Sequence, residues 1–254
     1  MSLNNKIALV TGGSRGLGKN TALRLAQNGS DVIVTYRKEK EAAEKIVSEI
    51  TGMGKKAAAL QLDVGDIGAL DAFVADVSQA VSDKWNRNHI DILVNNAGII
   101  AIEMIVETSE ETFDRLMNIH LKGVYFLTQK LLPKMAEGGR IVNFSSGLAR
   151  FSFPGYSAYA CMKGAVEVFT RYLAKELGDR KITANVVAPG PVATDMNKDR
   201  FESDPQMVEM LSSLTALDRV GQVDDIGGVV AFLCSDEAGW VNGQRIEVSG
   251  GMIL

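Results

Sequence analysis

Tyr159 and Lys163 are the pair of side chains whose types and spacing point most directly to proton transfer. Residues four apart lie on the same face of a helix, so the phenol and the ammonium can share one site. A free tyrosine has a pKa near about 10, too high for efficient proton exchange at neutral pH, and a neighbouring ammonium lowers it by favouring the phenolate. We therefore expect Lys163 to lower the pKa of Tyr159, and Tyr159 to act as an acid and base. The alternative is a surface pair without a chemical role.

Ser146 is the candidate partner for an oxygen atom that gains negative charge. It comes at the end of an apolar run, residues 140–145, that is typical of a buried strand. Its hydroxyl can donate a hydrogen bond to a carbonyl oxygen as charge develops there. Ser145 is the adjacent competitor; side chains alternate along a strand, so the two serines face opposite ways, and the choice between them rests on the family resemblance described below.

The cysteines and histidines do not indicate a metal site. Cys161 and Cys234 are far apart in the sequence and make neither a metal-ligand cluster nor a disulfide framework. We expect both to pack as small buried residues, with a reactive thiol at Cys161 as the alternative, because it lies close to Tyr159. His89 and His120 are too isolated to indicate a metal ion, and we expect none.

A glycine-rich turn follows the first apolar run and opens directly into an amphipathic stretch, with the sequence Thr11-Gly12-Gly13-Ser14-Arg15-Gly16-Leu17-Gly18. Gly12 and Gly16 allow a tight turn close to a pyrophosphate, and Gly18 allows close packing of helix on strand. The N-terminus of the following helix offers free N–H groups to the anion. The turn therefore predicts a dinucleotide site made by Gly12, Ser14, Arg15, Gly16, Leu17 and Gly18, although a turn without a ligand has the same spacing.

The second apolar run ends in Tyr36-Arg37-Lys38, where NAD-binding proteins of this architecture often carry an acidic residue for the ribose hydroxyls. This chain has no acid there. Arg37, together with Arg15, can instead form a cationic clamp for a 2′-phosphate. We therefore expect NADPH or NADP as the preferred cofactor, with NAD as the alternative, and we count Tyr36 and Arg37 among the cofactor-binding residues. Two solvated arginines without a ligand are the competing interpretation.

The elements that must position these residues alternate along the whole chain. Short apolar runs typical of buried strands occupy residues 7–11, 32–35, 57–61, 92–95, 140–145, 183–187 and 245–248. Amphipathic stretches with helical spacing occupy residues 18–28, 39–51, 70–85, 113–135, 160–177 and 223–233. This alternation predicts an α/β, doubly wound Rossmann fold with a single parallel seven-stranded sheet and helices on both faces. We expect one domain over residues 1–254, with an irregular insertion at about 190–221 as a substrate lid.

Composition narrows the class of partner. The formal net charge of -4 leaves no broad basic surface, so we expect no nucleic-acid partner. No apolar run is long enough to span a bilayer and the first residues lack signal-peptide features, so we expect no membrane association and a cytoplasmic location. With 46% hydrophobic residues, the chain can bury a substantial core.

With Asn95-Asn96-Ala97-Gly98 after the fourth apolar run and Tyr159-x-x-x-Lys163 further along, the chain closely resembles the short-chain dehydrogenase/reductase (SDR) family. The order and spacing of the family are matched by the TGxxxGxG turn, the NNAG segment, Asn118, Ser146, the YxxxK pair and Pro189-Gly190. The resemblance covers essentially the whole chain and is closest in pattern to 3-oxoacyl-[acyl-carrier-protein] reductases. It implies an NAD(P)-dependent oxidoreductase that interconverts a carbonyl group and a secondary alcohol.

The resemblance also implies roles for individual residues. The catalytic residues would be Asn118, Ser146, Tyr159 and Lys163, with Asn118 kinking a helix and holding a water that links Lys163 to solvent. Lys163 would also hold the nicotinamide ribose. Besides Tyr159 and Lys163, the further cofactor contacts that the resemblance implies are Asp63, Val64, Asn95, Ala97, Gly98, Pro189, Gly190, Val192 and Thr194.

The substrate is less closely tied to the fold. Residues expected around it are apolar or aromatic: Ile99, Ile100, Leu148, Phe151, Phe153, Tyr156, Phe201, Met207, Met210 and Leu211. They favour an apolar or aromatic carbonyl compound, although several would equally pack a lid onto the domain. A carrier-protein substrate would need a basic docking patch, for which Arg180 supplies one position while the other falls at Pro133.

Alternative functions within the family are other alcohol, steroid, quinone or sugar dehydrogenases. A non-catalytic NADP(H) sensor is disfavoured because all four catalytic residues are present, and a sugar-nucleotide epimerase is disfavoured by the chain length. Family members usually pair the helices that carry Asn118 and Tyr159, so we expect a homotetramer or homodimer. Val166, Phe169 and Leu173 fit either that interface or the core.

Overall fold

The computed structural model describes residues 2–195 and 197–254. One sheet contains seven parallel strands in the order β3-β2-β1-β4-β5-β6-β9. The strands are β1 Ile7–Val10, β2 Asp31–Tyr36, β3 Ala57–Gln61, β4 Ile90–Asn95, β5 Met135–Phe144, β6 Thr183–Pro189 and β9 Arg245–Val248. The predicted seven-stranded parallel sheet is confirmed. Strands β1, β4 and β6 are buried along their whole length, as expected for parallel strands covered on both faces.

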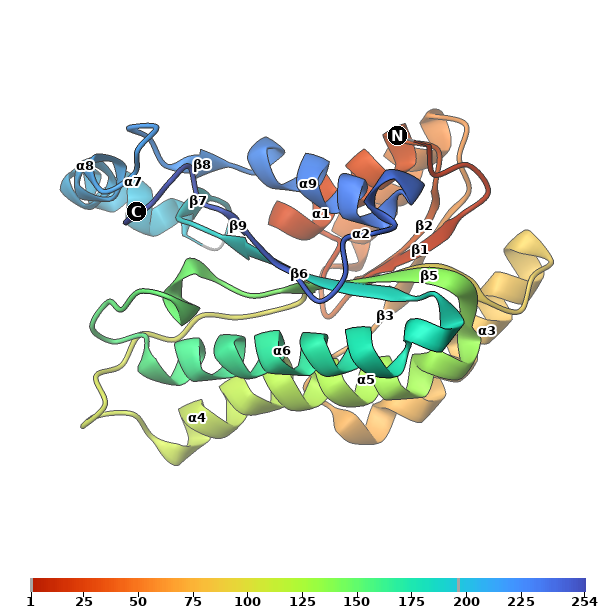
Figure 1. The fold of residues 1–254 in the computed structure, drawn as a ribbon, viewed down its shortest axis with the longest axis horizontal. Coiled ribbons are helices and arrows are strands. Elements are labelled where there is room, and N and C mark those ends of the chain that lie inside the picture. Colours follow the sequence, from red (N-terminus) through yellow and green to blue (C-terminus); the bar gives the residue numbers. More distant parts are fainter. Residues whose placement is uncertain (1, 196) are drawn as a thin grey trace.

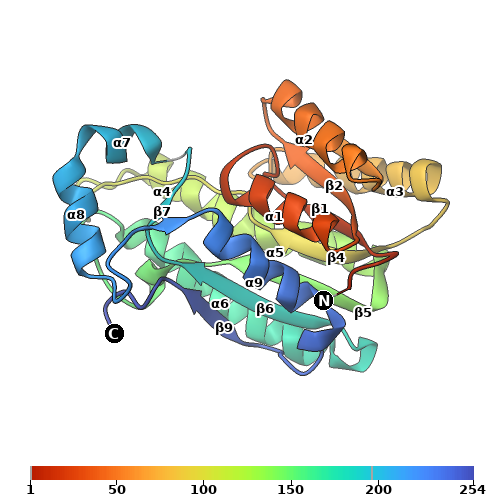
Figure 2. The same cartoon turned by 90° about the horizontal axis from the view of Figure 1, so that it is seen from above.

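Helices cover both faces of the sheet (Figures 1 and 2). Their bounds are α1 Gly16–Gln27, α2 Lys40–Gly52, α3 Leu70–Trp85, α4 Glu110–Met117, α5 Gly123–Leu131, α6 Ser157–Glu176, α7 Lys198–Ser203, α8 Pro205–Ser213 and α9 Asp224–Cys234. Helices α1, α2 and α9 pack on one face in one hydrophobic cluster. Helices α3, α5 and α6 pack on the other face in a second cluster. The molecule is therefore a doubly wound Rossmann fold.

The helix predicted over residues 113–135 is interrupted. Helix α4 passes into a π-helical turn, Asn118–Lys122, before α5 begins at Gly123. A Cβ atom at Gly123 would overlap the main-chain oxygen of Val64, so the helix approaches the loop after β3 more closely than any other residue type allows. The π turn changes which residues of this helix face the carboxyl edge of the sheet.

The segment predicted as an irregular insertion at about 190–221 contains regular structure. Helices α7 and α8 form most of it, and the short parallel strands β7 Val192–Ala193 and β8 Gly221–Gln222 join its two ends. The Asp204 side chain accepts a hydrogen bond from the Met207 N–H and caps α8, whose first residue is Pro205. The segment is thus a small helical unit beside the carboxyl ends of β6 and β9 (Figure 1).

The strand order reverses at β1, which lies between β2 and β4. The chain leaves β1 toward one side of the sheet and returns to β4 on the other, so the loops after these two strands diverge. Such a switch point leaves a crevice outside the carboxyl ends of the strands, where ligands of doubly wound sheets bind. The crevice in this protein is the cavity described next.

Candidate active site

A cavity of about 580 Å³ opens at the carboxyl edge of the sheet. Residues that follow β1, β2, β4, β5 and β6 line it, together with side chains from α6, α7 and α8. Its volume lies in the range of pockets for small molecules and cofactors. Leu62, Asp63 and Val64, which follow β3, also line it, so the topology brings the sequence-predicted residues from six strand ends into one space.

The glycine turn has the conformation that a dinucleotide site requires. Gly12 and Gly16 have φ angles of +65° and +53°, the left-handed region that favours glycine. A Cβ atom at Gly18 would overlap the Gly12 carbonyl oxygen, so only glycine fits there. The Gly12 N–H donates to Thr35 Oγ1 at 3.1 Å, which fixes the turn against β2. The backbone thus leaves the space and the direction that a pyrophosphate needs.

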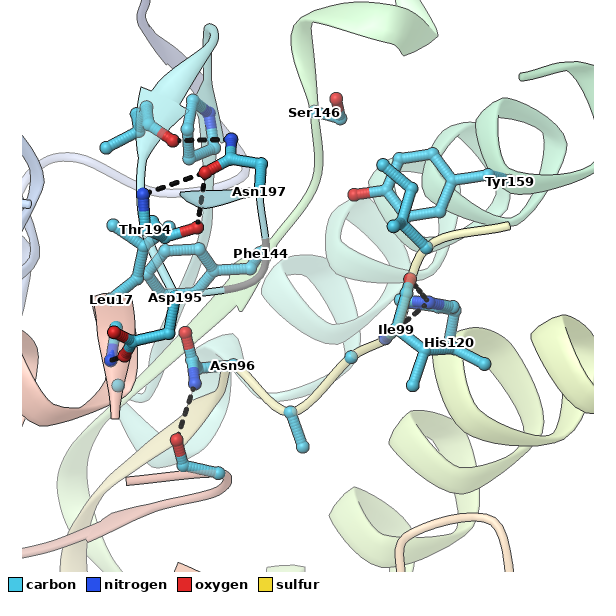
Figure 3. Close-up of a pocket in the computed structure, with 18 of the residues that line it drawn as sticks. Leu17, Asn96, Ile99, His120, Phe144, Ser146, Tyr159, Thr194, Asp195 and Asn197 are labelled. Atoms are coloured by element: carbon cyan, nitrogen blue, oxygen red, sulfur yellow. Dashed lines mark hydrogen bonds between the residues drawn. The ribbon is translucent and has the colours of Figure 1, made fainter. Parts of the chain in front are cut away.

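The N-terminus of α1 faces the cavity and binds a carboxylate from the segment after β6. Asp195 Oδ2 accepts a hydrogen bond from the Gly16 N–H at 3.1 Å (Figure 3). The first turn of α1 contains no acidic residue, and its N-cap residue, Arg15, makes no side-chain capping bond. An anion is therefore favoured at this position, as at other helix N-termini.

Arg15 and Arg37 are exposed and both line the cavity. Within the described residues, neither guanidinium makes a side-chain hydrogen bond or an ion pair, in contrast to Arg150, which binds Glu247 through two nitrogens. Unpaired guanidinium groups at the end of β2 can bind a phosphate group with two N–H donors each. The geometry therefore fits the 2′-phosphate of NADP(H).

Asn95 does not reach the cavity, contrary to the prediction for it. Its side chain is buried and donates hydrogen bonds to Thr128 Oγ1 at 3.0 Å and Asn143 Oδ1 at 2.8 Å. The neighbouring Asn96 lines the cavity instead, and its Nδ2 donates to the main-chain oxygens of Thr11 and Gly12 at 2.8 and 3.2 Å. Because side chains alternate at the end of a strand, only one of two adjacent asparagines can face the crevice.

The remaining predicted cofactor residues lie around the same cavity, and its lining includes Ser14, Leu17, Tyr36, Asp63, Val64, Ala97, Gly98, Pro189, Gly190, Val192 and Thr194. Asn197, which sequence analysis missed, fixes Thr194: its Oδ1 accepts from the Thr194 N–H at 2.9 Å and from Oγ1 at 3.1 Å (Figure 3). The Thr-x-x-Asn spacing is a turn signal that could have identified it.

Tyr159 and Ser146 both line the cavity, and the Tyr159 hydroxyl is directed into it (Figure 3). Ser146 is the second residue after β5, and Tyr159 lies in the first turn of α6. The adjacent Ser145 is committed elsewhere, because its Oγ donates to Glu167 Oε1 at 2.6 Å. Both serines line the cavity, and Ser146 is the one whose side chain has no such carboxylate partner among the described residues.

Lys163 does not lower the pKa of Tyr159 in this structure, contrary to expectation. Withdrawal from water raises the pKa of Tyr159 to about 12, and a hydrogen bond with Ser146 opposes this only in part. Burial also lowers the pKa of Lys163 to about 7, so it carries only part of a positive charge at neutral pH. Its Nζ lies 5.5 Å from the centre of the tyrosine ring and donates to the Phe144 carbonyl at 2.8 Å. Desolvation therefore outweighs the charge of the lysine.

Asn118 is also absent from the cavity lining. It is half-buried at the start of the π-helical turn, whereas His120, two residues on, is buried, lines the cavity and contacts the Tyr159 ring. Two residues along a helix point to nearly opposite sides, so both cannot face the site. Sequence analysis placed the fourth catalytic residue at Asn118, and the structure brings His120 to that wall instead.

The substrate end of the cavity is apolar. All of the residues predicted there line it: Ile99, Ile100, Leu148, Phe151, Phe153, Tyr156, Phe201, Met207, Met210 and Leu211. One cation lies among them, since Arg200 of α7 donates to the Tyr156 hydroxyl at 2.5 Å. The helical segment after β6 therefore forms one wall of the space beside Tyr159.

Two further predictions are corrected. Cys161 is exposed, not buried, whereas Cys234 is buried as expected. Arg180 is bound within the protein, to Glu137 at 2.9 Å and to the main-chain oxygens of Leu132 and Met135. It follows the C-terminus of α6, while Tyr159 is near the other end of that helix, roughly 30 Å away at 1.5 Å per residue. Within this chain, Arg180 is therefore already bound to other groups and lies at the end of α6 away from Tyr159.

No helix within the described residues is long and apolar enough to cross a membrane. Over the same residues, His, Cys, Asp and Glu side chains form no group of three that could hold a metal ion.

The doubly wound sheet, the glycine turn at its switch point and the tyrosine directed into the crevice together define a dinucleotide-dependent oxidoreductase. A family model described as enoyl-(acyl carrier protein) reductase matches residues 12–253. The chain belongs to the short-chain dehydrogenase/reductase family, whose members act on carbonyl and alcohol groups with NAD(P).

Named relatives cover nearly the whole chain. A versicolorin reductase of Emericella nidulans is 39% identical over 98% of this chain and 96% of its own length. A probable tetrahydroxynaphthalene reductase of Zymoseptoria tritici is 36% identical over 99% of this chain and 96% of its own. Among solved structures, the angucycline C-6 ketoreductase LanV with bound NADP is 37% identical, with a TM-score of 0.94 over 99% of this chain and 97% of that one.

Proposed function

We propose that this protein is an NADPH-preferring ketone reductase in which Tyr159 donates the proton. The observation that carries the proposal is the direction of the Tyr159 hydroxyl into a cavity that also contains Ser146, Lys163 and a glycine turn fit for a dinucleotide (Figure 3). Bound NADPH supplies a hydride to the carbonyl carbon. The relatives named as reductases and the neighbour solved with NADP support the same class.

The residues of this chain bind and protonate the carbonyl oxygen. Ser146 donates a hydrogen bond to that oxygen, and Tyr159 transfers its hydroxyl proton as negative charge develops. The pKa of Tyr159 is raised to about 12 by its withdrawal from water, so the phenol holds its proton at neutral pH.

The cofactor site consists of the cavity-lining residues at the carboxyl ends of the strands. Arg15 and Arg37 bind the 2′-phosphate, because both guanidinium groups are exposed beside the cavity and make no side-chain bond to a described residue. The other members are Gly12, Ser14, Gly16, Leu17, Gly18, Tyr36, Asp63, Val64, Ala97, Gly98, Tyr159, Lys163, Pro189, Gly190, Val192 and Thr194.

The substrate is an apolar or aromatic ketone. The aromatic and aliphatic side chains beside Tyr159 support this class, and so do the aromatic ring systems in the names of the relatives. A 3-oxoacyl thioester on a carrier protein is the second candidate, but Arg180, the matched basic docking position, is bound to Glu137 and to main-chain oxygens within the protein, which weakens the support for it. The segment of about 190–221 acts as the lid over this substrate.

The protein acts in the cytoplasm as a homotetramer or homodimer. Support for the assembly comes from the outer face of α5 and α6, where Tyr125, Val168 and Tyr172 are exposed to 42%, 44% and 62%. Val166 and Leu173, which the sequence left between interface and core, are buried in the monomer. The pairing face is therefore the outer side of these helices.

The test follows NADPH absorbance with purified protein and a panel of ketones: an aromatic polycyclic ketone, a cyclic aliphatic ketone and a 3-oxoacyl thioester. The account predicts the fastest oxidation of NADPH with the aromatic ketone and slower reaction with NADH. If the 3-oxoacyl thioester were reduced faster than both other ketones, the substrate class would be thioesters and not aromatic ketones. Tight NADPH binding with no turnover on any ketone would instead favour a non-catalytic sensor of NADP(H).

A further inference from the structure

His120 occupies a buried position against the reacting tyrosine that sequence analysis did not assign. Its side chain is 2% exposed. Its ring meets the Tyr159 ring edge to face, with centroids 5.1 Å apart and planes at 86° (Figure 3). A Cβ atom at Gly98 would lie 2.6 Å from His120 Cε1, so the imidazole packs directly on the main chain after β4. Any movement of this ring would therefore displace Tyr159 or the Gly98 backbone.

The hydrogen bonds of His120 fix one ring nitrogen and leave the other without a protein partner. Nε2 lies 2.7 Å from the Ile99 carbonyl oxygen and 3.2 Å from the Ile99 nitrogen. Because a carbonyl oxygen only accepts and makes the shorter contact, we assign the proton to Nε2. Nδ1 then carries a lone pair, and this atom is buried with no hydrogen-bond partner among the described residues.

A buried ring nitrogen without a hydrogen-bond partner is unfavourable, so its position calls for an explanation. His120 lines the cavity, where a water molecule or a bound group can complete the bond. The titratable groups that the structure places against the ring are Tyr159 and Lys163, both from α6. Burial, and then the charge of Lys163, hold the pKa of His120 well below its usual value. The imidazole is therefore neutral and keeps its acceptor at neutral pH.

We propose that His120, and not Asn118, is the positioning residue of this site: its ring fixes Tyr159, and its Nδ1 accepts a hydrogen bond from a water that also solvates the Lys163 ammonium. The inference rests on the proposed role of Tyr159 as proton donor. An acceptor beside Lys163 stabilises its charged form and maintains the supply of protons to the tyrosine. His120 itself gains and loses no proton in the cycle.

Three variants separate this role from packing alone. His120→Phe keeps a planar ring but removes both nitrogens, whereas His120→Asn can present an oxygen acceptor near the position of Nδ1. Asn118→Ala is the control on the same interrupted helix. The measurements are kcat and KM for NADPH and ketone from about pH 5.5 to 9, together with the dissociation constant for NADPH and the thermal midpoint.

For His120→Phe we expect kcat to fall by about 10- to 100-fold, with the dissociation constant for NADPH nearly unchanged, because the acceptor for the water beside Lys163 is lost and the ammonium is left less well solvated. The limb of the pH profile that reports Lys163 should move to lower pH. His120→Asn should recover most of the rate and the native limb, and Asn118→Ala should stay close to the native protein. Equal losses in Asn118→Ala and His120→Phe, or a native pH profile in His120→Phe, would overturn the proposal.

A second readout does not depend on turnover. The chain has two histidines, so ¹⁵N spectra of the histidine-labelled protein without cofactor contain two imidazoles, and His120→Asn assigns them. We expect His120 to show a protonated Nε2, a lone-pair Nδ1 and no titration between about pH 5.5 and 8. A protonated Nδ1 or an imidazolium at neutral pH would contradict the assignment. If the native protein reduces no ketone while this spectrum holds, the proposed function fails and the geometry of His120 stands.

Discussion

The Nζ atom of Lys163 lies 5.5 Å from the centroid of the Tyr159 ring and gives its hydrogen bond to the Phe144 carbonyl, 2.8 Å away. The lysine is therefore held by the main chain at the end of β5 and does not bond the phenol directly. Both groups are withdrawn from water, which disfavours charge on each of them. The folded protein thus holds a neutral phenol beside a lysine that titrates near neutrality. Burial of the lysine should lower the free energy of unfolding by an amount that can be measured.

Replacement of Lys163 by Met should change how stability depends on pH. Burial lowers the pKa of Lys163 to about 7, from 10.5. Between these values the unfolded chain holds the proton and the folded chain has lost it, so the unfolded state binds more protons and stability rises with pH. Below pH 7 both states are protonated, and the cost of the buried charge is complete. The difference in unfolding free energy between Lys163→Met and the native protein should therefore be largest near pH 6 and shrink toward pH 10.

This prediction is checked by urea unfolding of the cofactor-free protein at a series of pH values and one protein concentration. Lys175→Met provides the control, because Lys175 is exposed on the same helix. Parallel stability curves for Lys163→Met and the native protein would show that Lys163 is not desolvated in the fold.

Arg37 should determine the preference for NADPH. Arg37→Glu removes a bidentate donor for the 2′-phosphate and puts a carboxylate where it can bind ribose hydroxyls. We expect the dissociation constant for NADPH to rise by about 10- to 100-fold, as for the loss of a charge-assisted interaction, while that for NADH stays level or falls. Fluorescence titration with both cofactors measures it. Lys45→Glu makes the same charge change on the exposed side of α2; equal weakening in both variants would mean that only net charge matters.

Tyr172 should contribute to assembly. It is the most exposed of the three apolar side chains on the outer face of α5 and α6, and Tyr125 on the same face stacks on Phe169 with ring centroids 4.6 Å apart. A carboxylate in a buried apolar interface is strongly unfavourable. Tyr172→Glu should therefore lower the mass measured by light scattering, while the far-ultraviolet circular dichroism spectrum stays native. A native protein that is already monomeric at micromolar concentration would refute this interface.

Sequence periodicity was sufficient to predict the strands of the sheet and most helices, because the apolar residues that each element buries recur with the period of that element. Helix α3 begins and ends at the predicted residues. The helix interruption at Asn118 was expected only from the family resemblance; periodicity did not reveal the π turn at Asn118–Lys122, because it depends on a long-range contact, the approach of Gly123 to Val64. The short helix α7 was missed because a six-residue element has too few turns for a periodic signal.

The site was predictable where one element fixes the geometry. Tyr159 and Lys163 share a face of α6, and Ser146 follows the strand beside it, so all three reach the cavity. The Asn118 side chain does not reach the cavity, because the π turn sets which residue of this helix faces the site. The raised pKa of Tyr159 was missed for a related reason: the spacing of two residues indicates their proximity but not how much water both of them lose.

The most direct test of the account is the comparison of Tyr159→Phe with the native protein on the best ketone of the panel. The change removes one hydroxyl and keeps the ring that packs against His120. We predict a loss of about 10²- to 10⁴-fold in kcat, the contribution typical of a positioned general acid, with the dissociation constant for NADPH almost unchanged. A variant that reduces the ketone at nearly the native rate would show that the proton comes from another group, and the central claim would be wrong.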